Sequence, residues 1–171
     1  MIMSFLKRLF GQKNDMAKPV EERNMFNLQL DDIITYDLED YKLVGKISYD
    51  DHGFKWHAYQ LESVSKTIWL SVEMDDELYL GVYEKTKMKL QEPIPKKLEH
   101  EGITYFLDES GSARVTGIGR NQNIDGLICK YYDFCDEAEE HFLSVEKWGS
   151  EIEVSAGYEI EEYELKIIAS K

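Results

Sequence analysis

Two consecutive stretches of alternating residues constrain the fold of this chain more than any other feature. In residues 68–74, aliphatic side chains at every second position alternate with Trp69, Ser71 and Glu73. Residues 54–62 precede this stretch, and the polar residues 63–66 between them are typical of a turn. A period of two places successive side chains on opposite faces of a strand. The pattern therefore predicts two antiparallel strands, each with one aliphatic face.

Similar signals extend this pair into a meander of strands. Residues 43–49 also alternate, which predicts that Leu43, Gly45, Ile47 and Tyr49 share one face of a strand. The next four residues, Asp-Asp-His-Gly at 50–53, predict a hairpin because Asp and Gly tolerate positive φ angles. The apolar residues 33–36 and 78–83 predict further strands.

A degenerate copy of this pattern returns in the second half of the chain. The tetrad Leu-Ser-Val-Glu stands at both 70–73 and 143–146, and the same spacing aligns Tyr59 with Tyr132. We therefore predict an all-β fold of tandem duplicated antiparallel β-meander units, residues 27–92 and 93–171. A β unit of about 70 residues is marginally stable alone, so we expect the two to pack as a sandwich or barrel. The connector, residues 86–97, contains Pro93 and Pro95.

The first residues of the chain differ from the rest. Ser4 is a suitable helix cap, and apolar and basic residues then follow at helical spacing: Phe5, Leu6, Lys7, Arg8, Leu9 and Phe10. This pattern predicts a short N-terminal amphipathic helix within an N-terminal segment and linker, residues 1–26. Residues 1–20 carry a net charge of +3. Because the whole chain carries −14, the remaining residues carry −17. Three alternatives remain open: a weak anchor on an anionic membrane, a helix packed on protein, and a frayed terminus.

Composition and cysteine use exclude several classes of function. The net charge of −14 argues against nucleic-acid binding by the main body, because phosphate contacts require clustered Lys and Arg. Cys129 and Cys135 are not spaced as Cys-x-x-Cys, and we expect both to be reduced. No apolar run approaches the roughly 20 residues of a membrane span, and no secretory signal is recognisable. We expect a cytoplasmic protein, peripheral to the inner face of the membrane if the anchor forms.

Aromatic side chains on the predicted strands are the candidates for an interaction surface. Trp69, Trp56 and Tyr59 would form a recognition patch if exposed, and would pack in a twisted sheet if buried. Trp69 is the best of them because Ser71 and Glu73 give its face a polar character. Phe142, followed by Ser144 and Glu146, offers the corresponding face of the second unit.

No catalytic residue, metal site or cofactor is predicted. The acidic residues 136–141 fit neither a calcium loop nor a His-Glu-x-x-His helix, and we expect a solvated turn. Residues 117–120, Gly-Ile-Gly-Arg, lack the rest of a phosphate-binding loop and predict a hairpin or bulge. The four histidines stand in separate segments.

Three of the predicted strands resemble a known family. Residues 44–49, 56–61 and 69–73 give a Gly-x-hydrophobic strand, a Trp-x-x-Tyr strand and a Trp-Leu strand. This pattern resembles the bacterial domain of unknown function 4178, although Ala58 stands where that family commonly has an acidic residue. The resemblance implies an accessory protein that accompanies membrane-stress and phage-shock-type proteins, and it implies no activity.

Two functional hypotheses follow. The first is a non-enzymatic accessory or interaction module with a protein partner. The alternative is a small-ligand-binding or enzymatic β-domain with a pocket between the two units. A polar cleft with at least two convergent titratable groups would favour the alternative.

Overall fold

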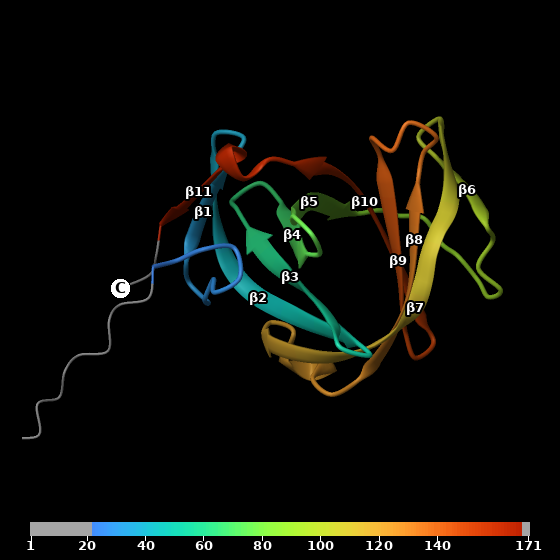
Figure 1. Ribbon diagram of the computed structural model, residues 1–171, viewed down its shortest axis with the longest axis horizontal. Helices are drawn as coiled ribbons and strands as arrows, with labels where there is room; N and C mark the ends of the chain where they lie inside the picture. The colour runs from blue at the N-terminus through green and yellow to red at the C-terminus, as the bar shows by residue number, and fades with distance from the viewer. Residues whose placement is uncertain (1–21, 169–171) are drawn as a thin grey trace, which may run out of the picture.

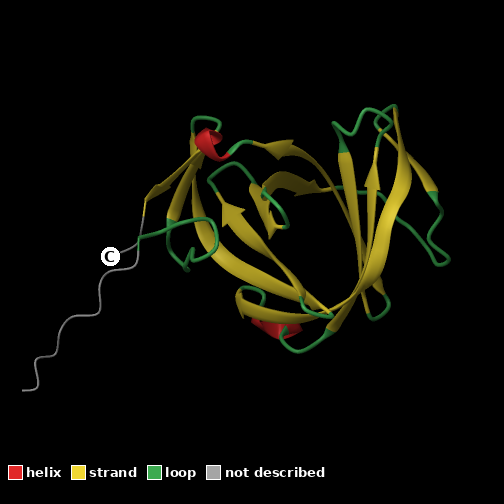
Figure 2. Cartoon of the chain, viewed as in Figure 1, coloured by secondary structure: helices red, strands yellow, loops and turns green. Residues whose placement is uncertain are grey.

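Strands make up most of residues 22–168, the part of the chain that the computed structural model describes (Figures 1 and 2). They are β1 (Ile33–Tyr36), β2 (Glu39–Asp51), β3 (Phe54–Glu62), β4 (Thr67–Met74), β5 (Leu78–Lys85), β6 (Lys97–His100), β7 (Ile103–Gly119), β8 (Ile128–Cys135), β9 (Phe142–Trp148), β10 (Glu151–Ile160) and β11 (Leu165–Ile168). Two 3-10 turns, η2 (Gln122–Ile124) and η3 (Glu162–Glu164), interrupt them. Within residues 22–168 there is no α-helix. The predicted N-terminal helix lies outside the described residues.

The sheet closes on itself as an eight-stranded barrel. Neighbouring strands follow the order β2-β3-β4-β5-β10-β9-β8-β7, and β7 pairs with β2 to complete the ring. All of these pairs are antiparallel. Figure 1 shows β2 and β7 along one side of the barrel, and β5 meets β10 on the opposite side. The all-β prediction is confirmed, and of the two expected packings the chain forms the barrel.

The predicted hairpin joins β2 to β3. His52 and Gly53 have positive φ angles of 53° and 101°, and the Gly53 N–H donates to the Asp50 carboxylate. Such a two-residue turn matches the right-handed twist of the paired strands. The hairpin predicted from Asp-Asp-His-Gly is therefore confirmed.

Bulges in the two longest strands move their side chains from one face of the sheet to the other. In β2, Leu43 pairs with Leu61 but Gly45 pairs with Gln60, so Val44 is an extra residue. The matching irregularity in β7 is at Asp108. A bulge opposes two residues to one and shifts the alternation of all that follow. The prediction that Leu43 shares a face with the residues at 45, 47 and 49 was therefore wrong.

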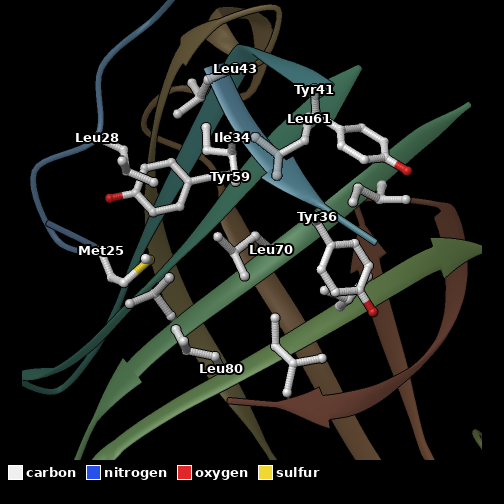
Figure 3. Packing of buried hydrophobic residues seen from close by; sticks show 14 residues of the cluster. Met25, Leu28, Ile34, Tyr36, Tyr41, Leu43, Tyr59, Leu61, Leu70 and Leu80 are labelled. Atoms are coloured by element: carbon white, nitrogen blue, oxygen red, sulfur yellow. The ribbon is translucent and has the colours of Figure 1, made fainter. Parts of the chain in front are cut away.

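Each half of the barrel buries an apolar cluster on the outer side of its strands. In the first half, Leu70 of β4 (Figure 3) is fully buried, as predicted, and so is Val72 of the same strand. Met25 and Leu28, which precede β1, belong to the same cluster, although the sequence assigned residue 25 to the linker. β11 contributes as well and pairs with β1.

The second cluster surrounds the repeated tetrad of β9. Leu143 and Val145 are buried there, as predicted, together with Phe134 of β8. Met88, Leu90 and Ile94 of the predicted connector pack against them, so this segment covers a core. With both outer faces occupied by aliphatic side chains, the alternate residues Ser71, Glu73, Ser144 and Glu146 line the interior of the barrel.

Candidate functional site

A cavity of about 510 Å³ lies inside the barrel between its two halves. Strands from both halves contribute side chains of two kinds. The aromatic ones are Tyr49, Phe54, Trp56, Trp69, Tyr83, Tyr131 and Trp148, and the acidic ones are Glu73, Glu109, Asp133, Glu146, Glu151 and Glu153. The only cationic lining residues within the described chain are Lys85 and Arg120. The cavity is therefore aromatic and strongly acidic.

The aromatic wall beside the β2–β3 hairpin has fixed geometry. Tyr49 stacks on Trp56 with ring centroids 4.8 Å apart and an interplanar angle of 3°. Trp56 meets the ring of Tyr131 edge-on at 5.2 Å and 76°. The Tyr131 hydroxyl donates to the Asp51 carboxylate at 2.7 Å, which ties β8 to the hairpin. Offset and edge-to-face contacts of this kind stabilise aromatic clusters beyond their burial.

Tyr83 of β5 lies at the junction of the two halves, where two glycines make room for its ring. A Cβ atom on Gly81 would lie 2.7 Å from the ring, and one on Gly157 of β10 would lie 2.5 Å from it. The side chain is half-buried, and desolvation raises the pKa of its hydroxyl. Among the described residues, no hydrogen bond joins this hydroxyl to another group. Tyr83 thus presents a neutral, unpartnered hydroxyl to the cavity.

Carboxylates from both halves face one another across the cavity. Burial raises the pKa of Asp133 on β8 to about 7, and the nearby charges of Glu146, Glu109 and Glu73 add to this rise. Burial likewise raises the pKa of Glu146 on β9 to about 7, although the Tyr49 hydroxyl donates to it at 2.6 Å. The pKa of Glu73 on β4 is raised by burial and then by Glu109. Close, desolvated carboxylates retain protons near neutral pH because their ionised forms repel.

The two cations of the lining are already paired. Lys85 Nζ lies 2.7 Å from Glu153 Oε1 and 5.8 Å from the centroid of the Trp69 ring. The Arg120 guanidinium donates two hydrogen bonds, of 2.6 and 2.7 Å, to the Glu62 carboxylate. Arg120 follows the predicted Gly-Ile-Gly segment, which ends β7 at Gly119 with a φ of 62°.

The structure separates the predicted aromatic candidates. Trp56 and Trp69 line the cavity, whereas Tyr59 is fully buried in the first apolar cluster, on the opposite face of β3. Alternation along β3 explains the difference, because Tyr59 is three residues from Trp56. Phe142 is half-buried at the start of β9 and does not line the cavity. The N-terminal candidates, residues 5–10, lie outside the described residues.

The other sequence motifs do not line the cavity. His57 hydrogen bonds with Ser48, its Nδ1 lying 3.0 Å from Oγ, and neither residue lines the cavity. The acidic segment at 136–141 forms the turn between β8 and β9, with His141 Nδ1 2.8 Å from Asp136 Oδ2. Within residues 22–168, no group of three or more His, Cys, Asp or Glu side chains could hold a metal ion.

Several cavity residues were not recognised from the sequence: Tyr83, Lys85, Glu109 and Asp133. A signal for Asp133 was present, because it continues the alternating face of Cys129 and Tyr131 in a strand whose only other charged residue is Lys130. Buried carboxylates at such positions occur at functional sites more often than elsewhere.

The fold and cavity define the class of this protein: a closed antiparallel barrel with an internal acidic and aromatic pocket. The chain matches the family model Domain of unknown function (DUF4178) over residues 29–162, and it belongs to this family. No curated protein and no solved structure matched the chain. In the described part of the chain, no helix combines the length and apolar character needed to cross a membrane.

Proposed function

We propose that this protein is a non-enzymatic accessory module that binds a small organic ligand inside its barrel. The observation that carries the proposal is the cavity itself, with aromatic surfaces and titratable groups converging from both halves. Its volume of about 510 Å³ falls within the roughly 300–1,000 Å³ of small-molecule sites. This function combines the non-enzymatic role of the first sequence hypothesis with the pocket of its alternative.

The rigidity of the lining supports binding of a defined ligand. Tyr49, Trp56 and Tyr131 hold one another through ring contacts, and hydrogen bonds fix the two tyrosines to Glu146 and Asp51. A site that is already formed loses little conformational entropy when it binds. The unpartnered Tyr83 hydroxyl and the half-buried Glu73 then provide polar contacts that select among ligands of similar size.

Native mass spectrometry of the protein purified from its own cells tests this proposal. We expect the wild-type protein to carry a small-molecule adduct. Ala58→Trp should abolish it because Ala58 lines the cavity and the indole would fill that space. Val64→Trp is the matched control, since Val64 is fully exposed in the β3–β4 turn.

Circular dichroism would verify that Ala58→Trp folds, and Ser71→Phe, from the adjacent strand β4, provides a second way to fill the cavity. Wild-type protein without any adduct, or equal adducts on wild-type and both filled variants, would contradict the proposal.

We also propose that the two halves arose by tandem duplication. Three observations support this. β4 and β9 carry the same tetrad with the same residues buried, and β2 and β7 each contain one bulge. The strand order is also mirrored about the β5–β10 junction. An experimental structure tests the proposal by superposition of β1–β5 on β6–β10. Residues 70–73 should lie on residues 143–146, and a different strand path in the two halves would refute the duplication.

A further inference from the structure

The cavity contains four carboxyl groups that form no ion pair within the described chain. Glu73, Glu109, Asp133 and Glu146 project from β4, β7, β8 and β9, and the last three of these strands are neighbours in the sheet. Of the two cationic lining residues, Lys85 pairs with another lining carboxylate, Glu153, and Arg120 pairs with Glu62. Buried carboxylates are costly unless a positive group accompanies them. A ligand with a positive charge would supply that group.

Lys85 shows the kind of cation that this wall accommodates. Its ammonium group lies over the Trp69 ring, at 5.8 Å from the centroid, and contacts Glu153 at 2.7 Å. An aromatic face combined with a carboxylate is the arrangement that binds alkylammonium groups. The cavity continues from this point past Ser71 and Glu73, and the further tryptophans Trp56 and Trp148 also line it.

Tyr83 supplies a polar contact for a ligand. Its hydroxyl lies close enough to Asp133 and Glu73 for their charges to raise its pKa, and within the described chain it has no hydrogen-bond partner. A tyrosine hydroxyl that faces a cavity can both donate and accept a hydrogen bond. A ligand ammonium beside these carboxylates can donate an N–H to the phenolic oxygen, which completes its hydrogen bonding.

These contacts point to one class of ligand. We infer that the cavity binds an organic cation, whose ammonium group lies among Glu73, Asp133 and the Tyr83 hydroxyl and whose apolar part contacts the tryptophans. The inference rests on the proposed function and specifies the ligand of that cavity. A bare metal ion does not fit, because no described group of side chains could coordinate one and the space exceeds that of an ion.

Isothermal titration calorimetry with three probes of nearly equal shape tests the charge requirement. The probes are phenethylamine, 2-phenylethanol and phenylacetate, which are cationic, neutral and anionic at pH 8. We expect phenethylamine to bind at least about tenfold more tightly than 2-phenylethanol, and phenylacetate not to bind. Coulombic attraction across a partly desolvated site supports a difference of this size.

Two variants locate the ammonium group. Glu73→Gln and Asp133→Asn each remove one charge with little change of shape, and each should weaken phenethylamine binding about tenfold while leaving 2-phenylethanol unchanged. Glu137→Gln is the matched control, because Glu137 is exposed in the β8–β9 turn. If Glu137→Gln weakened phenethylamine binding equally, the loss would come from the overall charge of the protein. That result would overturn the assigned position of the ammonium group.

The outcomes separate this inference from the proposed function. Equal binding of phenethylamine and 2-phenylethanol, both lost in Ala58→Trp, would overturn the cation while leaving the binding cavity intact. A native adduct without binding of phenethylamine would have the same meaning. Absence of both the adduct and probe binding would overturn the inference and the proposed function together.

Discussion

Asp133 illustrates how the position of one carboxylate changes its chemistry. Burial, followed by the charges of Glu146, Glu109 and Glu73, raises its pKa to about 7. In the unfolded chain an Asp side chain titrates near its ordinary pKa of about 3.9. Between these values the folded protein retains a proton that the unfolded chain releases. The resulting contribution to stability is complete below about pH 4 and is lost as the pH rises through about 7.

The first prediction concerns this pH dependence. Asp133→Asn cannot ionise, so its free energy of unfolding should fall less than that of the wild type between about pH 5 and pH 8. Urea denaturation at several pH values measures the difference between the two curves. Other carboxylates titrate in both proteins, so only the difference between the Asp133→Asn and wild-type curves reports on Asp133. Glu137→Gln is the control. Parallel curves for Asp133→Asn and the wild type would show that Asp133 is ionised throughout.

The repeated tetrads provide the second prediction. Leu70 and Leu143 are almost completely buried in separate apolar clusters. Replacing either by alanine should reduce the free energy of unfolding by about 2–5 kcal/mol, since each change leaves a cavity in a packed core. Val64→Ala in the exposed β3–β4 turn is the control and should change stability very little. Losses below about 1 kcal/mol at both leucines would contradict the described packing.

Among the elements, the strands and tight turns were predictable because their signals are local. The alternation in β4 placed Leu70 and Val72 in a core, and the Asp-Asp-His-Gly turn specified the β2–β3 hairpin. The bulges were not predictable, since Val44 and Asp108 interrupt sequences that continue to alternate. A bulge changes which face is buried without changing the pattern of residue types.

The two strand pairings that close the barrel could not be predicted from local sequence patterns. β2 pairs with β7 and β5 with β10, so each junction joins strands from different halves. Such pairings depend on the whole fold, and no turn specifies their register. The cavity follows from this closure, which explains why Glu73 and Glu146 could be recognised as a polar face but not as opposing groups.

The third prediction concerns β11. This strand pairs with β1, and Leu165 and Ile167 pack against the first apolar cluster. Removing residues 165–171 should lower the melting temperature by several degrees, because it exposes the edge of β1 and part of that cluster. Differential scanning calorimetry measures the change, and removal of residues 169–171 alone is the control. Equal melting temperatures for the two truncations would show that β11 adds no stability.

At the scale of the whole molecule, titratable groups from both halves of the barrel influence one another's pKa values in the cavity. The fourth prediction follows from this coupling. Asp133 and Glu146, with pKa values of about 7, gain negative charge as the pH rises above neutrality. The charged and titratable groups that influence them are Glu73, Glu109, Glu153, Lys85 and Tyr49. Phenethylamine should therefore bind more tightly at pH 8 than at pH 6.

Binding of this cation should also release protons, because a positive charge favours the ionised carboxylates. Titrations in buffers of different ionisation enthalpy measure the number released. In Asp133→Asn the pH dependence should be weaker, whereas in Glu137→Gln it should match the wild type. Affinity that does not change between pH 6 and pH 8 would contradict the prediction.

The last prediction concerns the basic N-terminal segment and the acidic remainder of the chain. We propose that the N-terminal segment contacts anionic membranes, since Phe5, Leu6, Leu9 and Phe10 accompany Lys7 and Arg8 in a region of net charge +3. Each basic residue near such a surface contributes about 1 kcal/mol, so binding should be weak and reversible. The remaining −17 opposes it, but charges beyond about 8–10 Å are largely screened at physiological salt.

Sedimentation with liposomes that contain an anionic lipid tests this contact. The intact protein should pellet at low salt and return to the supernatant as salt is added. Deletion of residues 1–11 should abolish pelleting, and so should Phe5→Asp combined with Leu9→Asp, which removes the apolar face. Liposomes of neutral lipid are the control. If the intact protein stays in the supernatant at low salt, the membrane contact is refuted. The apolar residues of this segment should then pack against protein, and hydroxyl-radical footprinting should show them protected from oxidation.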